Sequence, residues 1–308
     1  MRHYHAFGLR IASELELSEL HPSCGPADVR IFYREVAAAE RDADLDWLEG
    51  QGETVRLHLD GIAFTVTAGQ RIDIDAPPGT PPADVRIRLL GSVIAALLSQ
   101  RGRLTIHANL IALAPHRAMA FAAESGGGKS TLAAWFEQRG YAVLADDLCA
   151  MQTDAAGTVQ AFEGIPRLKL WGESLRAFGR NEADLERVAT AVDKYHVPLH
   201  RARDEGSLDP LPLERMYLLG RAEEGKPLAI EHLHGADAAA AVLRNIYRWQ
   251  IGQRVQRDPR AQFDQCLALA RYAAVFRVRR RWGMQWFDED AEAIERHLIA
   301  PVEDARKD

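Results

Sequence analysis

The chain has 308 residues, of which 47% are apolar and 27% charged, and its formal charge is −6 at neutral pH. This length and composition predict a folded protein of one large or two modest domains and exclude a disordered chain. The negative charge argues against nucleic-acid binding through bulk electrostatics. The opening residues lack an apolar signal core, and no run of about 18 apolar residues occurs, so we expect a cytoplasmic protein with no membrane partner.

Residues 1–82 are predicted to form a small β-rich accessory domain and a linker. Strands are expected at 29–36, 55–59, 62–66 and 71–74. Asp60-Gly61, between two of these strands, favours a two-residue hairpin turn. The segment 76–82 contains Pro77, Pro78, Pro81 and Pro82, which is typical of a stiff, extended linker. A second domain would therefore span 83–308.

The second domain is predicted to be α/β, with helices and strands alternating along the chain. Its first elements are expected to be a helix at 84–100, strands at 104–107, 110–114 and 118–122, a helix at 132–139, and a strand at 141–145. Further along, we expect strands at 148–152, 158–162, 213–219, 227–233 and 275–281, and helices at 237–249, 259–272 and 290–298. Asp237 is the expected N-cap of its helix. Residues 193–196 are expected in a loop and 200–209 in a mobile loop that could act as a lid.

Residues 123–131, Ala-Glu-Ser-Gly-Gly-Gly-Lys-Ser-Thr, lie between an apolar strand pattern and an amphipathic helix pattern. A helix N-terminus directs unpaired N–H groups and a positive dipole end at a bound anion, and glycines let the loop backbone curl around it. Lys129 would reach the β- and γ-phosphates, and the Ser130 hydroxyl would take a Mg²⁺ position. The pattern G-x-x-x-x-G-K-[ST] has Ala123 in place of its first glycine. The alternative is a glycine-rich turn before an unrelated helix.

The expected ATP-binding loop therefore consists of Glu124, Ser125, Gly126, Gly127, Gly128, Lys129, Ser130 and Thr131. Asp146 and Asp147 directly follow the next predicted strand, at the sheet edge where open α/β folds place their ligands. Adjacent strand positions point to opposite sides, so one acid can hold Mg²⁺ while the other orients an attacking hydroxyl. An Asp-Asp pair in a solvated turn is the structural alternative.

Cationic residues downstream are candidates for contacts with phosphate or substrate. Arg167 and Lys169 alternate on an extended segment and would project the same way. Cations at such a position can stabilise the charge of a transferring phosphoryl group. Lys194 is a weaker candidate of the same kind. The alternative is an exposed strand whose basic residues are solvated.

Together, these motifs resemble the HPr serine kinase/phosphorylase family. The resemblance is carried by Ser-Gly-Gly-Gly-Lys-Ser, by Arg-Gly-Tyr-Ala-Val-Leu-Ala-Asp-Asp at 139–147, and by Ile106-His107 upstream. Residues 4–15 and 165–171 are similar to kinases found with lasso-peptide biosynthesis. The resemblance implies that Asp146 is the catalytic base, that His107 hydrogen-bonds it, and that Asp147 serves the metal. Thr131 stands where the phosphorylases usually carry an acid, which argues against a reverse reaction.

The resemblance implies an HPr-kinase-type P-loop domain that uses ATP and Mg²⁺ to phosphorylate a serine hydroxyl of a peptide or protein. The lasso-like segments favour the C-terminal serine of a lasso-peptide precursor as the acceptor. HPr itself is the alternative acceptor, and a non-catalytic regulator that senses nucleotide is the alternative from another class. The catalytic residues would be Asp146, His107 and Lys129, with Ser130 and Asp147 at the metal. A homo-oligomer is also expected.

Overall fold

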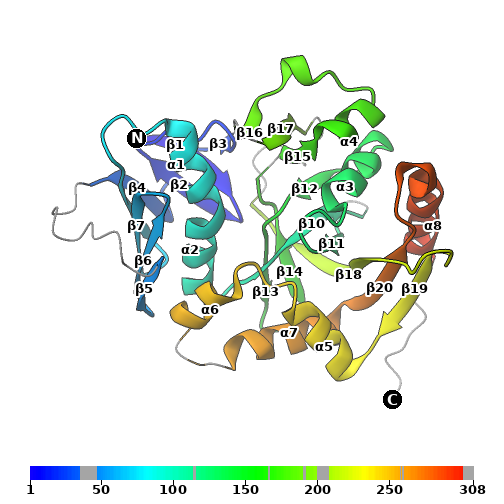
Figure 1. Cartoon of the computed structure of the whole chain (residues 1–308). Coiled ribbons are helices and arrows are strands. Elements are labelled where there is room, and N and C mark those ends of the chain that lie inside the picture. Colours follow the sequence, from blue (N-terminus) through cyan, green and yellow to red (C-terminus); the bar gives the residue numbers. More distant parts are fainter. Residues whose placement is uncertain are drawn as a thin grey trace.

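The structure, a computed structural model, describes residues 1–34, 47–113, 116–165, 167–189, 192–199, 208–256, 258 and 260–300. These residues form a mixed α/β protein with two large sheets and one small sheet (Figure 1). The N-terminal sheet lies at one end of the molecule, and helix α8 (Phe287–Ile299) lies at the other. Among the helices of these described ranges, none has the length and apolar character needed to cross a membrane.

The N-terminal sheet has the strand order β3-β1-β2-β4-β8-β7-β6-β5. Its strands are β1 (Arg2–Ala6), β2 (Leu9–Ser13), β3 (His21–Pro22), β4 (Val29–Tyr33), β5 (Leu48–Gln51), β6 (Thr54–Leu59), β7 (Ile62–Thr67) and β8 (Arg71–Asp75). The predicted hairpin is present, because β6 and β7 pair directly across Asp60-Gly61. Both turn residues have positive φ, 51° and 79°, as a two-residue hairpin turn requires.

A helical segment packs on the N-terminal sheet. It comprises α1 (Pro82–Arg88), a π-helical turn η2 (Leu89–Val93) and α2 (Ile94–Gln100). Its buried side chains, among them Leu89 and Leu97, share one hydrophobic core with Phe64 and Val66 of β7. The predicted domain boundary between 82 and 83 therefore separates this helical segment from the sheet that covers its apolar face.

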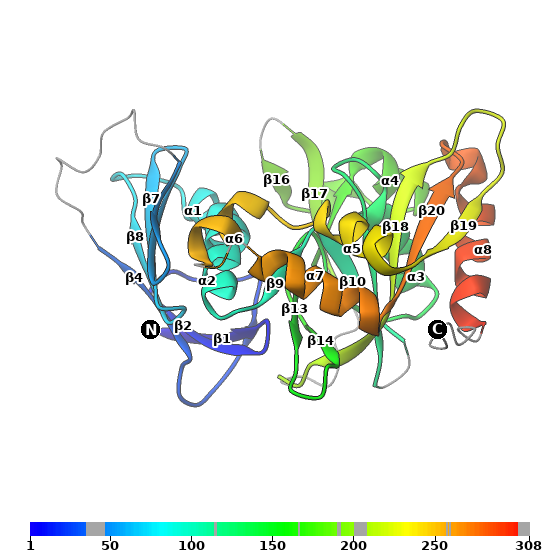
Figure 2. The same cartoon turned by 90° about the horizontal axis from the view of Figure 1, so that it is seen from below.

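The central sheet continues from this segment, with the path β12-β10-β11-β18-β14-β13-β9 and with β20 pairing both β18 and β19. Its strands are β9 (Leu104–Ile106), β10 (Ala108–Ala112), β11 (Ala118–Ala122), β12 (Val143–Ala145), β13 (Cys149–Thr153), β14 (Val159–Phe162), β18 (Leu211–Arg221), β19 (Ala229–Leu233) and β20 (Ala274–Arg280). Helices α5 (Gly235–Leu243) and α7 (Ala261–Tyr272) cover one face (Figure 2). Helices α3 (Lys129–Gln138) and α8 cover the other.

A small sheet, β15-β17-β16, lies beside helix α3. Its strands are β15 (Arg167–Trp171), β16 (Arg187–Ala189) and β17 (Val192–Pro198), and α4 (Gly172–Ala177) and η3 (Glu182–Asp184) connect the first two. The prediction of a loop at 193–196 is wrong, because this segment lies within β17 and its residues 194–196 pair with β15. Residues 200–207 of the predicted lid lie outside the described residues.

The helix predicted at 237–249 is two helices. Helix α5 ends at Leu243, and α6 begins at Trp249 and ends at Val255. Arg248 between them has a φ of 44°, a left-handed conformation that a continuing α-helix cannot contain.

Asp237 lies in the first turn of α5 and makes no capping hydrogen bond, so the predicted N-cap is wrong. The final helix, α8, follows the 3-10 turn η4 (Met284–Trp286).

Candidate functional site

Three strand ends meet at one edge of the central sheet. Both β11 and β12 run antiparallel to β10, so their carboxyl ends and the amino end of β10 come together. The glycine loop follows β11, Asp146-Asp147 follows β12, and His107 directly precedes β10. Strand order thus brings together three segments that lie as much as 40 residues apart in the chain.

The glycine loop leads directly into α3. Gly128, just before the helix, has a φ of +77°, which a glycine adopts without steric cost. A Cβ on Gly127 would lie 2.7 Å from the Cβ of Ala123, so this position requires glycine. The alanine that replaces the first consensus glycine is itself buried and has no positive φ. The loop therefore forms its tight turn even though Ala123 replaces the first glycine of the consensus pattern.

Lys129, the first residue of α3, is buried with its ammonium group at the sheet edge. Its Nζ donates to the carbonyl oxygen of Ala123 at 3.0 Å and lies 3.0 Å from Nε2 of His107. Burial lowers the pKa of Lys129, while the nearby charges of Asp147 and Asp146 act in the opposite direction. The ammonium group thus faces the carboxylate pair across His107.

Asp146 is a buried carboxylate that accepts three hydrogen bonds. Ser130 Oγ and Asn109 Nδ2 donate to its Oδ1 at 2.9 and 2.8 Å, and the backbone N–H of Lys169 donates to its Oδ2 at 2.7 Å. Burial, followed by the charge of Asp147, raises the pKa of Asp146 to about 6. Asp146 therefore connects α3, β10 and β15, and it is held against the loop serine.

The raised pKa of Asp146 predicts a stability difference that depends on pH. The folded protein binds this proton more tightly than the unfolded chain, in which an aspartate has a pKa of about 3.9. The stability that Asp146 contributes is therefore present below about pH 4 and is lost as the pH rises through about 6. We therefore expect the thermal stability of Asp146→Asn, relative to that of the wild type, to increase as the pH rises from about 4 to about 6.

Melting temperatures of the nucleotide-free protein with a chelator, measured from pH 4 to pH 7, test this expectation. Asp154→Asn is the control, because Asp154 lies on an exposed turn and its pKa is lowered, chiefly by a hydrogen bond from Gln160. The melting temperature of Asp154→Asn should be slightly lower than that of the wild type, a difference opposite in sign to that of Asp146→Asn. A difference between Asp146→Asn and the wild type that does not vary with pH would contradict the burial argument.

Asp147 follows in a left-handed backbone conformation, with a φ of 67°. The N–H of Leu148 donates to the carbonyl oxygen of Asp146 at 2.9 Å, which closes a three-residue turn around Asp147. A non-glycine residue in this region is strained, and such strain concentrates at functional sites. The turn directs Asp147 into a cavity, whereas Asp146 is buried behind it.

The Asp147 carboxylate lies among nitrogen atoms. Its Oδ2 accepts from Lys169 Nζ at 3.1 Å, and its Oδ1 is 3.5 Å from His107 Nε2. Burial alone would raise the pKa of Asp147, but His107, Lys169 and the charge of Lys194 together outweigh burial and lower it. Asp147 is therefore ionised and faces the cavity at neutral pH.

His107 is held in place by the segment between α5 and α6. Its backbone N–H donates to the carbonyl oxygen of Asn245 at 2.8 Å, and its ring packs edge-on against Tyr247 at 5.9 Å between centroids. Ile106 and Ile246 form an isolated bridge next to it. Asn245 and Tyr247, which were predicted only as part of a helix at 237–249, thus position a side chain of the site.

The pairing within the site is the reverse of the one that the resemblance implied. His107 was expected to contact Asp146, and Ser130 was expected to share the metal with Asp147. The structure places His107 against Asp147 and Ser130 against Asp146. The reason is the turn at Asp147, which rotates the second carboxylate toward β9 and the first toward α3.

The cationic candidates separate into two groups. Lys169 and Lys194 both line the cavity, and they face it from paired strands. Arg167 does not line it, because its guanidinium lies 3.3 Å from Glu19, a nearly buried carboxylate that Arg86 also contacts. The structure thus places Arg167 at the junction with the N-terminal sheet. Glu124 also lies outside the cavity lining, while residues 125–131 are part of it.

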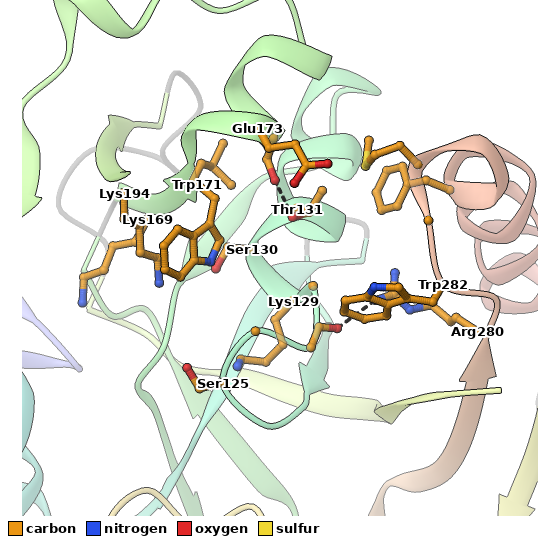
Figure 3. Close-up of a pocket in the computed structure, with 18 of the residues that line it drawn as sticks. Ser125, Lys129, Ser130, Thr131, Lys169, Trp171, Glu173, Lys194, Arg280 and Trp282 are labelled. Atoms are coloured by element: carbon orange, nitrogen blue, oxygen red, sulfur yellow. Dashed lines mark hydrogen bonds between the residues drawn. The ribbon is translucent and has the colours of Figure 1, made fainter. Parts of the chain in front are cut away.

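The cavity has a volume of about 220 Å³ and includes residues that sequence reasoning did not identify as site residues. Trp171 and Trp282 lie on opposite sides of Lys129 (Figure 3). Arg280, which the sequence analysis placed only in a strand, donates to the carbonyl oxygen of Gly127 at 2.8 Å. Asn109 was also not predicted as a site residue. The feature of the sequence that could have identified it is a polar residue inside an otherwise apolar strand pattern.

The site has the donors that a Mg²⁺ ion would require. Magnesium is bound through one or two carboxylates together with phosphate oxygens and water, and the oxygens of Ser130 and Asp146 are adjacent. Among the described residues, no cluster of three His, Cys, Asp or Glu side chains could hold a metal by itself. The oxygens of Ser130 and Asp146 fit a Mg²⁺ ion whose other ligands are phosphate oxygens and water.

No protein-family model matches the sequence, and no curated protein matches it. Among solved structures, the chain is similar to the Hpr(Ser) kinase/phosphatase from Coxiella burnetii, at 11% identity and a TM-score of 0.32. The match covers 63% of this chain and 90% of that one. A TM-score of 0.32 is too low to support an inference about fold or function.

Proposed function

We propose that this protein is a Mg²⁺- and ATP-dependent kinase that transfers the γ-phosphoryl group to a serine hydroxyl of a peptide or protein. The observation that carries the proposal is the convergence at one cavity of a glycine loop, a buried lysine and an ionised, strained carboxylate. A loop with Lys129 and Ser130 at a helix N-terminus suits a polyphosphate. A carboxylate opposite it suits an acceptor hydroxyl.

Each residue then has a distinct task. The loop amides and Lys129 hold the phosphates, while Ser130 and Asp146 present oxygen atoms to the metal. A bound Mg²⁺ supplies charge neutralisation for the phosphate oxygens. Asp147 accepts the hydrogen bond of the acceptor hydroxyl and takes its proton, and His107 and Lys169 orient Asp147. Because its pKa is lowered, Asp147 is a weak base, so positioning and electrostatics contribute most of the acceleration.

The acceptor is a finer proposal that rests on the sequence. Residues 4–15 and 165–171 are similar to the lasso-associated kinases, so we propose the C-terminal serine of a lasso-peptide precursor as the acceptor. In the structure, residues 167–171 form strand β15, which carries Lys169 at the cavity. A segment of that similarity thus contributes directly to the site.

The proposal predicts a mass increase of one phosphate on a serine-terminated precursor peptide incubated with the protein and Mg-ATP. Intact-mass measurement checks this, beside a parallel sample of HPr and a sample with the Asp147→Asn variant. Phosphorylation of HPr alone would show that HPr is the acceptor and would leave the assignment as a kinase unchanged. Bound ATP with neither acceptor labelled would contradict the kinase and favour a regulator that senses nucleotide.

A further inference from the structure

The two sides of the cavity differ in chemistry. On one side lie the carboxylate of Asp147 and the ammonium groups of Lys169 and Lys194. On the other side lie Trp282, Met284 and Phe287, which follow strand β20. Figure 3 shows Lys129 between these two sides. Phosphates held at Lys129 would therefore have a charged side and an apolar side within reach.

The charged side marks where the γ-phosphoryl group belongs. Lys129 contacts His107, and His107 contacts Asp147, so the reacting end of a triphosphate lies on the side of these residues. Trp171 stands on that same side, with Lys194 5.8 Å from its ring centroid. The opposite end of the nucleotide, which carries the base, must then extend toward the apolar side.

Trp282 offers a suitable surface there. Its side chain is 52% exposed although it is a large aromatic group, and it lines the cavity. Arg221 lies over one face of its ring, 5.6 Å from the centroid, and a planar ring has a second face to offer. A nucleobase stacked on an exposed aromatic ring gains affinity without needing specific hydrogen bonds.

The residues that precede Trp282 are fixed to the phosphate site. Arg280 donates to the carbonyl oxygen of Gly127 in the loop itself. Arg281 donates to the buried carboxylate of Asp290 in α8 through its backbone N–H and its Nε, both at 2.9 Å. These bonds hold the indole at a set position relative to the loop, and preorganisation of this kind favours binding.

We propose that Trp282 is the platform for the purine base of the nucleotide, so that the base and the acceptor occupy opposite sides of the cavity. This inference rests on the proposed function, because it requires ATP in the loop. The occupant is a planar nucleobase linked to a polyphosphate. The platform lies outside the loop motif.

The test compares the affinities of Mg-ATP and of inorganic tripolyphosphate, measured by calorimetry, in the wild type and in Trp282→Ala. Loss of one stacking contact should weaken ATP binding by about 5- to 150-fold and leave tripolyphosphate binding unchanged. Retained tripolyphosphate binding also shows that the loop is still folded. Trp282→Phe, which keeps an aromatic ring, should recover most of the ATP affinity.

Trp249→Ala is the matched control, because Trp249 is similarly exposed at 50% and is not among the residues that line the cavity. Its ATP affinity should remain that of the wild type. Equal ATP affinity in Trp282→Ala and the wild type, or an equal loss in Trp282→Ala and Trp249→Ala, would overturn the inference and leave the proposed kinase intact. A wild type that binds neither ATP nor tripolyphosphate would overturn both.

Discussion

Asp147→Asn should lower kcat for phosphoryl transfer by about 10²- to 10⁴-fold, with Mg-ATP affinity nearly unchanged. Asp147 is the carboxylate of the pair that faces the cavity, and it is held there by His107 and Lys169. An amide at this position cannot take the proton of an acceptor hydroxyl. The loss should therefore fall on kcat, because the nucleotide is bound by other residues.

Asp146→Asn tells the two carboxylates apart. Asp146 contacts Ser130 and is proposed to serve the metal, so this variant should require more Mg²⁺ for half-maximal rate. Transfer rates for both variants over a range of Mg²⁺ concentrations are the measurement, with the exposed Asp154→Asn as the control. If Asp147→Asn retained transfer while Asp146→Asn lost it at every Mg²⁺ concentration, the roles would be those that the resemblance implied.

Lys129→Met should reduce kcat/KM by about 10²- to 10³-fold, the usual cost of removing one preorganised group that faces developing charge. It should also abolish the rise in melting temperature that Mg-ATP causes in the wild type. Methionine keeps the length and the apolar stem of the side chain, so the buried site stays filled. Only the ammonium group between Ala123 and His107 is lost.

Lys226→Met is the matched control, because Lys226 is exposed and is not among the residues that line the cavity. It should leave the nucleotide-induced shift and the transfer rate as they are in the wild type. A nucleotide-induced shift of wild-type size in Lys129→Met would show that the loop binds nucleotide without its lysine, and the assignment of the phosphate site would then be wrong.

Local patterns predicted several elements well. The Asp60-Gly61 turn joins β6 to β7 as expected, because two adjacent residues of positive φ suffice to reverse a hairpin. The strand, glycine loop and helix around Lys129 were also predicted, because their signals lie within one short window. An element whose conformation depends on residues close to it in the sequence can therefore be predicted from a local sequence pattern.

Long-range packing limited the rest of the fold prediction. Strand β17 was expected to be a loop because its strand character comes from pairing with β15. The proline-rich segment looked like a domain boundary, yet the helical segment after it shares a core with the N-terminal sheet. No local pattern states which of two surfaces an apolar helix face will cover.

For the site, the sequence by itself determined which groups are available: a glycine loop with Lys129 and Ser130, and an adjacent pair of carboxylates. Only the tertiary structure decided their partners. The left-handed turn at Asp147 sets which acid faces the cavity, and β10 running antiparallel between β11 and β12 brings His107 and Asn109 to them. The physical reason is that strand order and backbone rotation, not separation along the chain, set the distances between these side chains.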